Sequence, residues 1–322
     1  MDQPTPPSHR EWARNISGLA VGSSAGVWKV AVDAYYWDRL AEAFAFATEL
    51  GVTAPFHEWM FRLIESEAVT REKGTIAEIG DRISLEIVPN EIDDPERATS
   101  DVLQACAEVR QRFNWPEGAD TLVSVLAEET DAPWTVGRAG YMMDKYPYDK
   151  ICIPRGATVH PPMLQAVIRH EYAHVMVLNL SQGKATTYLH EAITMVAERT
   201  DRSRDWHLFA AGQAPWQNPT DLDSAFDDRH DPARFAARSL AYSQSAAIGY
   251  FLRSRGGEAT LGRLLRAFAE NSNWSELKRT LAGRSPADEM LRQVYGVSEK
   301  DVFSQTLQVL TQQAGRGPRG AS

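Results

Sequence analysis

Two histidines and a glutamate stand together in the segment His170-Glu171-Tyr172-Ala173-His174. If this segment is a helix, the two histidines project from the same face, one turn above the other. Their ring nitrogens could then bind one Zn²⁺ at about 2.0–2.1 Å. Glu171 lies one step around the helix, where its carboxylate can reach a water on the metal but is badly placed as a ligand. The segment therefore predicts a zinc ion that lowers the pKa of a water, with Glu171 as the general base.

A catalytic zinc site needs a third protein ligand and one open position. Glu191 follows a predicted turn at residues 181–184 and lies near the start of a further predicted helix. We expect the chain to double back and bring Glu191 to the metal. Glu198, on the same face of that helix, is the alternative ligand; otherwise it is a hydrogen-bond partner of a ligand histidine or a solvated carboxylate. His190 is interpreted as a residue that lines the cleft or caps the helix.

The elements that must position these residues change in character along the chain. Near the N-terminus, helical spacing of apolar residues predicts two helices, at 33–50 and after Pro55, which form a hairpin. The middle of the chain contains the alternating or apolar segments typical of strands, and Pro161 and Pro162 begin the helix that carries the histidines. The predicted strands are 83–87, 121–127 and 150–153, and the predicted later helices are 188–200, 235–254, 258–270, 274–282, 286–295 and 298–312.

The histidine helix and Glu191 together resemble the gluzincin metallopeptidases, the clan of thermolysin-like and M1 aminopeptidase-like enzymes. The closest resemblance is to the peptidase MA-like group, in which the zinc helix is followed by a Trp-Leu-x-Glu-Gly-like segment, here Tyr188-Leu189-His190-Glu191-Ala192. The resemblance covers about residues 80–310 and is strong over 165–200 and 240–255. It implies one Zn²⁺ per chain and hydrolysis of a peptide bond. Tyr242 would donate a hydrogen bond to the oxyanion, with Tyr250 as the alternative.

The resemblance also implies a fold. We predict an α+β protein with a zincin-like catalytic domain, in which a small mixed sheet and the histidine helix precede a helical C-terminal half and follow an N-terminal helical hairpin. The predicted segments are an N-terminal arm and helical segment (1–75), a strand-rich half with the zinc helix and the third-ligand helix (76–200), a helical half (201–313) and a disordered tail (314–322).

Several positions depart from the family pattern. Met143 stands where aminopeptidases carry the glutamate that binds the substrate amine, and only Asp144 could substitute for it. Met195 stands where thermolysin-like enzymes carry an aspartate that orients a histidine, and Ala192 replaces the usual glycine. These departures leave open a zinc hydrolase of a modified peptide or a non-protein amide. A non-catalytic binding protein with the same fold also stays open, although the retained Glu171 argues against it.

The segment before the zinc helix could contact the substrate. In this clan an edge strand at that place pairs with an extended peptide, and residues 150–153 are the corresponding strand. Aromatic and methionine side chains in the preceding segment, residues 137–148, would line substrate pockets or form a hydrophobic rim.

Composition excludes several classes of partner. The 322 residues include 34 Lys and Arg and 43 Asp and Glu, for a net charge of −9 without a basic stripe. We therefore expect neither nucleic acid nor an anionic membrane as a partner. Cys106 and Cys152 are expected to be buried free thiols. The small apolar stretch at 16–27 is rich in Gly and Ser and lies late for a signal peptide, so we expect a cytoplasmic protein. The family resemblance implies that its partner is a peptide or protein substrate.

Overall fold

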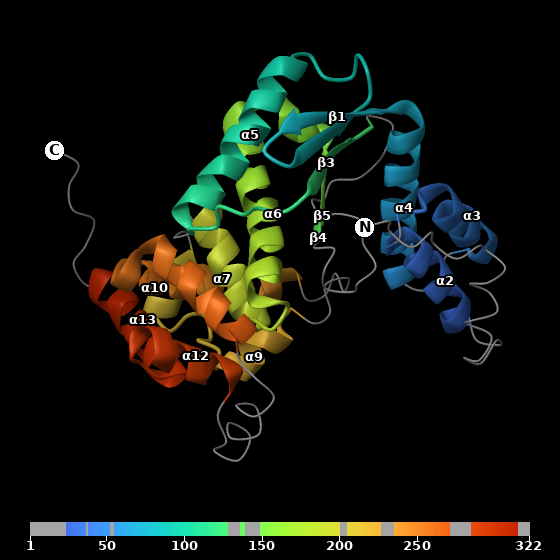
Figure 1. Ribbon diagram of the computed structural model, residues 1–322. Helices are drawn as coiled ribbons and strands as arrows, with labels where there is room; N and C mark the ends of the chain where they lie inside the picture. The colour runs from blue at the N-terminus through green and yellow to red at the C-terminus, as the bar shows by residue number, and fades with distance from the viewer. Residues whose placement is uncertain are drawn as a thin grey trace. The chain divides into compact units, whose positions relative to one another are not determined.

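The computed structural model describes residues 24–36, 38–51, 55–127, 136–138, 149–199, 205–226, 235–270 and 285–314. These residues combine α-helices with one mixed sheet, as expected (Figure 1). They belong to two compact units, one of residues 1–99 with 120–160 and one of residues 100–119 with 161–322. The predicted arm before residue 11, the predicted helix at 274–282 and the tail after Ala314 lie outside the described residues.

The first unit contains the sheet, in the order β1-β2-β3-β5-β4. The central pairs, β2 with β3 and β3 with β5, are parallel, whereas β1 and β4 pair antiparallel with their neighbours. The strands are β1 Thr75–Gly80, β2 Ile83–Ile87, β3 Thr121–Leu126, β4 Val136–Arg138 and β5 Asp149–Pro154. The three predicted strands are thus confirmed as β2, β3 and β5.

Two strands were not predicted, and one was misplaced. The side chains of β1 are exposed or half-buried along its whole length, so its sequence has no buried face to produce an alternating pattern. β4 has only three residues, too few for any periodicity. The expectation that residues 150–153 form an edge strand is wrong, because β5 lies between β3 and β4, and β4 is the edge.

The N-terminal part of the first unit has three described helices, where a two-helix hairpin was predicted. They are α2 Ser24–Tyr36, α3 Leu40–Leu50 and α4 Pro55–Lys73. The predicted helix at 33–50 is broken between α2 and α3, where Asp38 adopts a left-handed backbone with φ of 57°. Apolar residues continue at helical spacing across this break, so the sequence pattern does not reveal it.

A buried polar network joins these helices to the sheet. The ammonium group of Lys150 on β5 is fully buried between Glu67 of α4 and Asp38, which lies 3.2 Å away. Tyr35 of α2 donates to the same Glu67 carboxylate at 2.5 Å. Arg71 of α4 pairs with Asp38 at 2.8 Å and with Glu86 of β2. Because a buried charge is tolerated only when it is paired, these contacts fix α2 and α4 on the sheet.

The second unit is helical. Its helices are the later part of α5 (Pro95–Arg112 in full), α6 Pro161–Ser181, α7 Thr187–Glu198, α8 Trp206–Ala210, α9 Pro219–Ser224, α10 Phe235–Glu270, α12 Pro286–Tyr295 and α13 Glu299–Ala314. The predicted pair 235–254 and 258–270 is confirmed as α10, which bends at Gly257, where the backbone is non-helical (φ 74°, ψ 177°). Helices α8 and α9 are too short for a helical pattern and were not predicted.

Three helices of this unit pack against one another: α7 contacts both α6 and α10, and α10 also contacts α6. Helices α10 and α7 approach closely at Gly249 of α10, where a Cβ atom would lie 2.2 Å from the carbonyl oxygen of Ala192 on α7. Only glycine permits two helix backbones to approach so closely. The position of α7 is therefore determined by backbone contact on one side and by α6 on the other.

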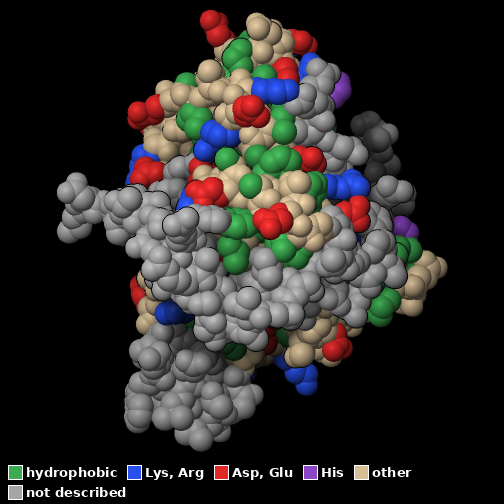
Figure 2. Space-filling view, turned by 90° about the vertical axis from the view of Figure 1, so that its right-hand side faces the viewer, with side chains coloured by type: hydrophobic (Ala, Val, Ile, Leu, Met, Phe, Trp, Pro, Cys, Tyr) green, Lys and Arg blue, Asp and Glu red, His purple; other side chains and the backbone are tan. Residues whose placement is uncertain are grey.

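The surface carries charges of both signs. Figure 2 shows acidic and basic side chains interspersed with hydrophobic ones over the described part of one face. Among the described residues, no helix combines the length and the apolar character needed to cross a membrane.

Candidate metal centre

The histidine segment lies within α6, as predicted. Pro161 and Pro162 begin this helix, and Leu164, Ile168 and Val175 are among its buried residues. It ends in a turn in which Gln182 and Gly183 have left-handed backbones, and the Gly183 amide donates to the carbonyl of Leu178 at 3.1 Å. This turn reverses the chain so that α7 returns along α6, as the predicted turn at residues 181–184 requires.

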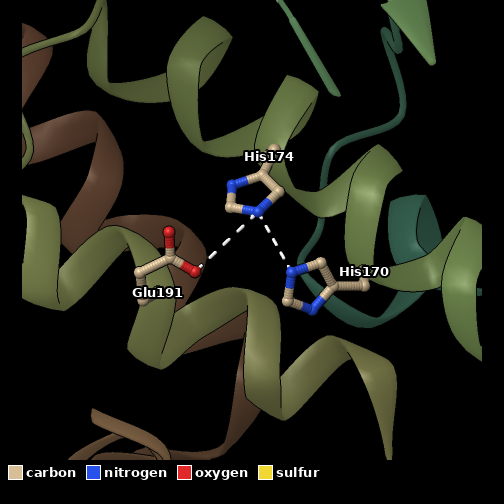
Figure 3. Close-up of side chains that lie close together, drawn as sticks. All are labelled: His170, His174 and Glu191. Carbon is tan, nitrogen blue, oxygen red and sulfur yellow. Dashed lines mark hydrogen bonds and ion pairs between the residues drawn. The ribbon is translucent and has the colours of Figure 1, made fainter. Parts of the chain in front are cut away.

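Figure 3 shows that His170, His174 and Glu191 point toward a common centre. Their candidate ligand atoms all lie within 4.8 Å of one another. The Nε2 atom of His174 lies 3.1 Å from Nε2 of His170 and 3.9 Å from a carboxylate oxygen of Glu191. The structure therefore brings together the three residues that the sequence predicted as ligands, two from α6 and one from α7.

The other ring nitrogen of each histidine has a partner of its own. Nδ1 of His170 lies 3.1 Å from a carboxylate oxygen of Glu198, and Nδ1 of His174 lies 2.8 Å from Nε2 of His190. A carboxylate only accepts, so Nδ1 of His170 carries the hydrogen when the ring is neutral, and its Nε2 then presents a lone pair. If Nδ1 of His174 donates to His190, then Nε2 of His174 likewise presents a lone pair.

The chemistry of this donor set fits a metal cation. Two imidazole lone pairs and a carboxylate that converge on one point repel each other unless a positive charge lies between them. Two histidines and one glutamate are also a ligand set of catalytic zinc sites that keep an open position. Glu191 is buried, with 1% of its surface exposed, so water screens this repulsion poorly.

The pKa of His170 reports the same negative surroundings. Burial on its own would lower this pKa. The hydrogen bond with Glu198 and the charges of Glu171 and Glu191 act in the opposite direction, and the net pKa lies above its ordinary value. The carboxylates around this ring therefore favour positive charge at the centre, whether it is a proton or a metal ion.

Glu198 and His190 contact the Nδ1 atoms of the two histidines of the cluster. Of the alternatives left open for Glu198, the structure places it on the Nδ1 side of His170, buried to 7% exposure and outside the three-residue cluster. It is therefore not a solvated carboxylate. His190 pairs with the ring of His174, a contact that neither predicted role, cleft lining or helix capping, had named. Residues in such positions orient ligand histidines and fix their tautomers.

Glu171 follows the first histidine on α6 and is 4% exposed. Its negative charge is among those that raise the pKa of His170. The adjacent Tyr172 points elsewhere and packs on Trp115, with ring centroids 5.4 Å apart.

The two tyrosines proposed as oxyanion donors lie on α10. Tyr242 is half-buried and packs edge-on against Phe226, with ring centroids 5.1 Å apart. It precedes Gly249 by seven residues, two helical turns, so it projects from the face of α10 that meets α7. Tyr250 packs instead against Trp206 at 5.9 Å and lies beside Arg253. Of the two, Tyr242 is on the side that faces the ligand-bearing helix.

The remaining sequence predictions about substrate contacts concern residues of which little is described. Met143 and Asp144 lie outside the described residues, as does most of the segment 137–148. Met195 is buried within α7 at 3% exposure and packs in the core, which agrees with a second carboxylate partner having to come from elsewhere.

Comparisons of the chain with models of known protein families, with curated proteins and with solved structures found no match.

Proposed function

We propose that this protein is a zinc-dependent hydrolase that cleaves a peptide bond. The observation that carries the proposal is the convergence of His170, His174 and Glu191 on one point. In addition, Nδ1 of each histidine lies within hydrogen-bond distance of another side chain. This arrangement leaves two nitrogen lone pairs and one carboxylate for a single cation, which is the donor set that zinc takes in hydrolases.

Zinc bound there would supply a water of lowered pKa and polarise the carbonyl of the scissile bond. The chain's own residues then have separate tasks. Glu171, buried and next to His170 in the chain, accepts the proton of the attacking water. Tyr242 donates a hydrogen bond to the oxygen on which negative charge develops, and Glu198 and His190 hold the two rings in the required orientation.

Metal binding is tested first, without reference to activity. Protein purified without chelator is dialysed against zinc and its metal content is measured. We expect one zinc per chain in the wild type and a large loss of affinity in His170→Asn. The exposed His207 provides a matched control, and His207→Asn should bind zinc as the wild type does. A wild-type protein that binds no zinc, or equal binding by both histidine variants, contradicts the proposed centre.

Catalysis is tested on a mixed pool of peptides, with the products identified by mass spectrometry. Glu171→Gln removes the base without removing a ligand, so it should bind zinc normally while its turnover falls by about 10²–10⁴-fold. Glu270→Gln, at an exposed position of α10, is the control for the substitution itself. If the wild type binds zinc but cleaves no better than Glu171→Gln, the protein is not a peptidase, and a modified amide or a binding role takes its place.

A further inference from the structure

The C-terminal turn of α7 is held by an arginine from a distant part of the chain. The last carbonyl groups of a helix have no partner within the helix and carry partial negative charge. Here the guanidinium group of Arg112 on α5 donates to the carbonyl oxygens of Val196 and Ala197, each at 3.1 Å. Arg199 ends the helix with a left-handed backbone, φ 62°.

Arg112 is itself fixed by a carboxylate. Both oxygens of Glu258 accept from it, at 2.7 Å from Nε and 2.5 Å from Nη2. The side chains of Arg112 and Glu258 are only 9% and 13% exposed, so this two-point contact is largely shielded from water. Glu258 directly follows Gly257, where α10 bends. One guanidinium group therefore ties together α5, the bend of α10 and the end of α7.

The turn that Arg112 holds also carries Glu198. The Glu198 carboxylate lies 3.1 Å from Nδ1 of His170, and its backbone directly follows the carbonyl of Ala197 that Arg112 contacts. A displacement of this turn would move the carboxylate away from the histidine. Glu191, seven residues earlier, is held by the Gly249 contact of its neighbour Ala192 and would be affected less.

We propose that Arg112 is a positioning residue for the candidate metal centre. By binding the carbonyls of Val196 and Ala197 while Glu258 holds it in place, Arg112 keeps Glu198 at hydrogen-bond distance from His170. The carbonyl of Glu198 itself accepts from Arg169 of α6 at 3.4 Å. The proposal rests on the zinc site proposed above. Only an arginine fits this role, because its planar fork can donate to two carbonyls and a carboxylate at once, whereas a lysine ammonium cannot span them.

The test is the zinc affinity of folded, initially metal-free protein, measured by competition with a coloured chelator. Arg112→Lys keeps the charge but loses the fork, and we expect zinc binding to weaken by about 10-fold, at the lower end of the range for lost supporting contacts. Glu198→Gln should weaken it by about 10–100-fold. Arg253→Lys is the matched control, because Arg253 contacts the same Glu258 carboxylate at 3.0 Å from an exposed position, and its zinc affinity should equal that of the wild type.

A double variant separates positioning from a general effect on stability. If Arg112 acts through Glu198, then Arg112→Lys adds nothing in the Glu198→Gln background, and the double variant binds zinc as Glu198→Gln does. The visible absorption of Co²⁺-loaded protein should also change in Arg112→Lys and stay unchanged in Arg253→Lys. Should Arg112→Lys fail to fold, Glu258→Gln removes the negative charge and one of the two acceptor oxygens that hold Arg112, and it should also weaken zinc binding.

The outcomes that overturn the inference differ from those that overturn the zinc site. Equal zinc affinity of wild type and Arg112→Lys, or additive losses in the double variant, rejects the role of Arg112 while the metal centre stands. Absence of zinc binding by the wild type rejects both.

Discussion

The contact between Gly249 and Ala192 provides a sharp test of the helix packing that positions the candidate site. In Gly249→Ala, the new Cβ would lie 2.2 Å from the Ala192 carbonyl oxygen, 2.9 Å from its carbon and 3.0 Å from a methyl group of Val196. Ordinary contacts begin at 3.4 Å, so α10 and α7 must separate by about 1 Å. The nearest obstacle is backbone, which cannot rotate away as a side chain would.

The magnitude follows from two opposing effects. Alanine is more favourable than glycine in a helix by about 1 kcal/mol. Extra volume in a packed interface costs about 1–3 kcal/mol, and a clash with a backbone carbonyl belongs at the upper end of that range. We therefore expect Gly249→Ala to lower the free energy of unfolding by about 2 kcal/mol, measured by urea denaturation.

The same separation should reach the metal centre, because Ala192 follows Glu191 directly. We expect Gly249→Ala to bind zinc more weakly than the wild type. Gly156→Ala is the control: Gly156 is exposed, and its added Cβ would meet nothing within 4 Å. If Gly249→Ala is as stable as the wild type and binds zinc as well, then the close approach of α10 and α7 does not determine the geometry of the site.

Three further predictions concern other parts of the chain. Cys106 and Cys152 are 2% and 1% exposed, and burial raises the pKa of the Cys106 thiol, so neither should react with a thiol reagent until the protein unfolds. Tyr188→Phe removes a 2.7 Å hydrogen bond to the buried Glu299 and should cost about 1–3 kcal/mol in urea denaturation. Burial would raise the pKa of Glu258, but the hydrogen bond from Arg112 and the charges of Arg112, Arg253 and Arg199 lower it on balance below the ordinary 4.5. The stabilisation should therefore be complete above about pH 4.5 and disappear as the pH falls through the lowered pKa, so the stability difference from Glu258→Gln should shrink in acid.

The sequence predicted the features of this protein that depend on local signals. The helix that carries His170 and His174 begins at two prolines and ends at a glycine turn, and both signals are visible in the sequence. Helix α12 begins after Ser285, which accepts from the amide of Asp288, and ends at Gly296. Glu191 was accessible as a ligand because only one turn separates its helix from the histidines.

The features that the sequence did not predict depend on contacts between distant residues. Helical spacing placed Glu191 and Glu198 on one face, so spacing alone could not say which carboxylate faces Nε2 and which faces Nδ1. The pairing of Arg112 with Glu258 joins residues 146 positions apart, and neither belongs to a recognisable motif. Lys150 similarly gave no sign that it would be buried within a strand, because its partners Glu67 and Asp38 come from other elements.

Helix α7 shows why the candidate ligands can be predicted from the sequence but their placement cannot. Thr186, the residue that precedes the helix, makes no side-chain cap, and the amide of Tyr188 donates instead to Asp223, at 2.7 Å. At the other end, Arg112 binds the carbonyls of Val196 and Ala197, and Arg169 binds that of Glu198. Both ends of the helix thus have partners that are remote in sequence, and isolated helices of this length are marginal in water. The helix that brings Glu191 to the histidines therefore acquires its position from the folded second unit. The metal centre that we propose should form only when that unit is folded.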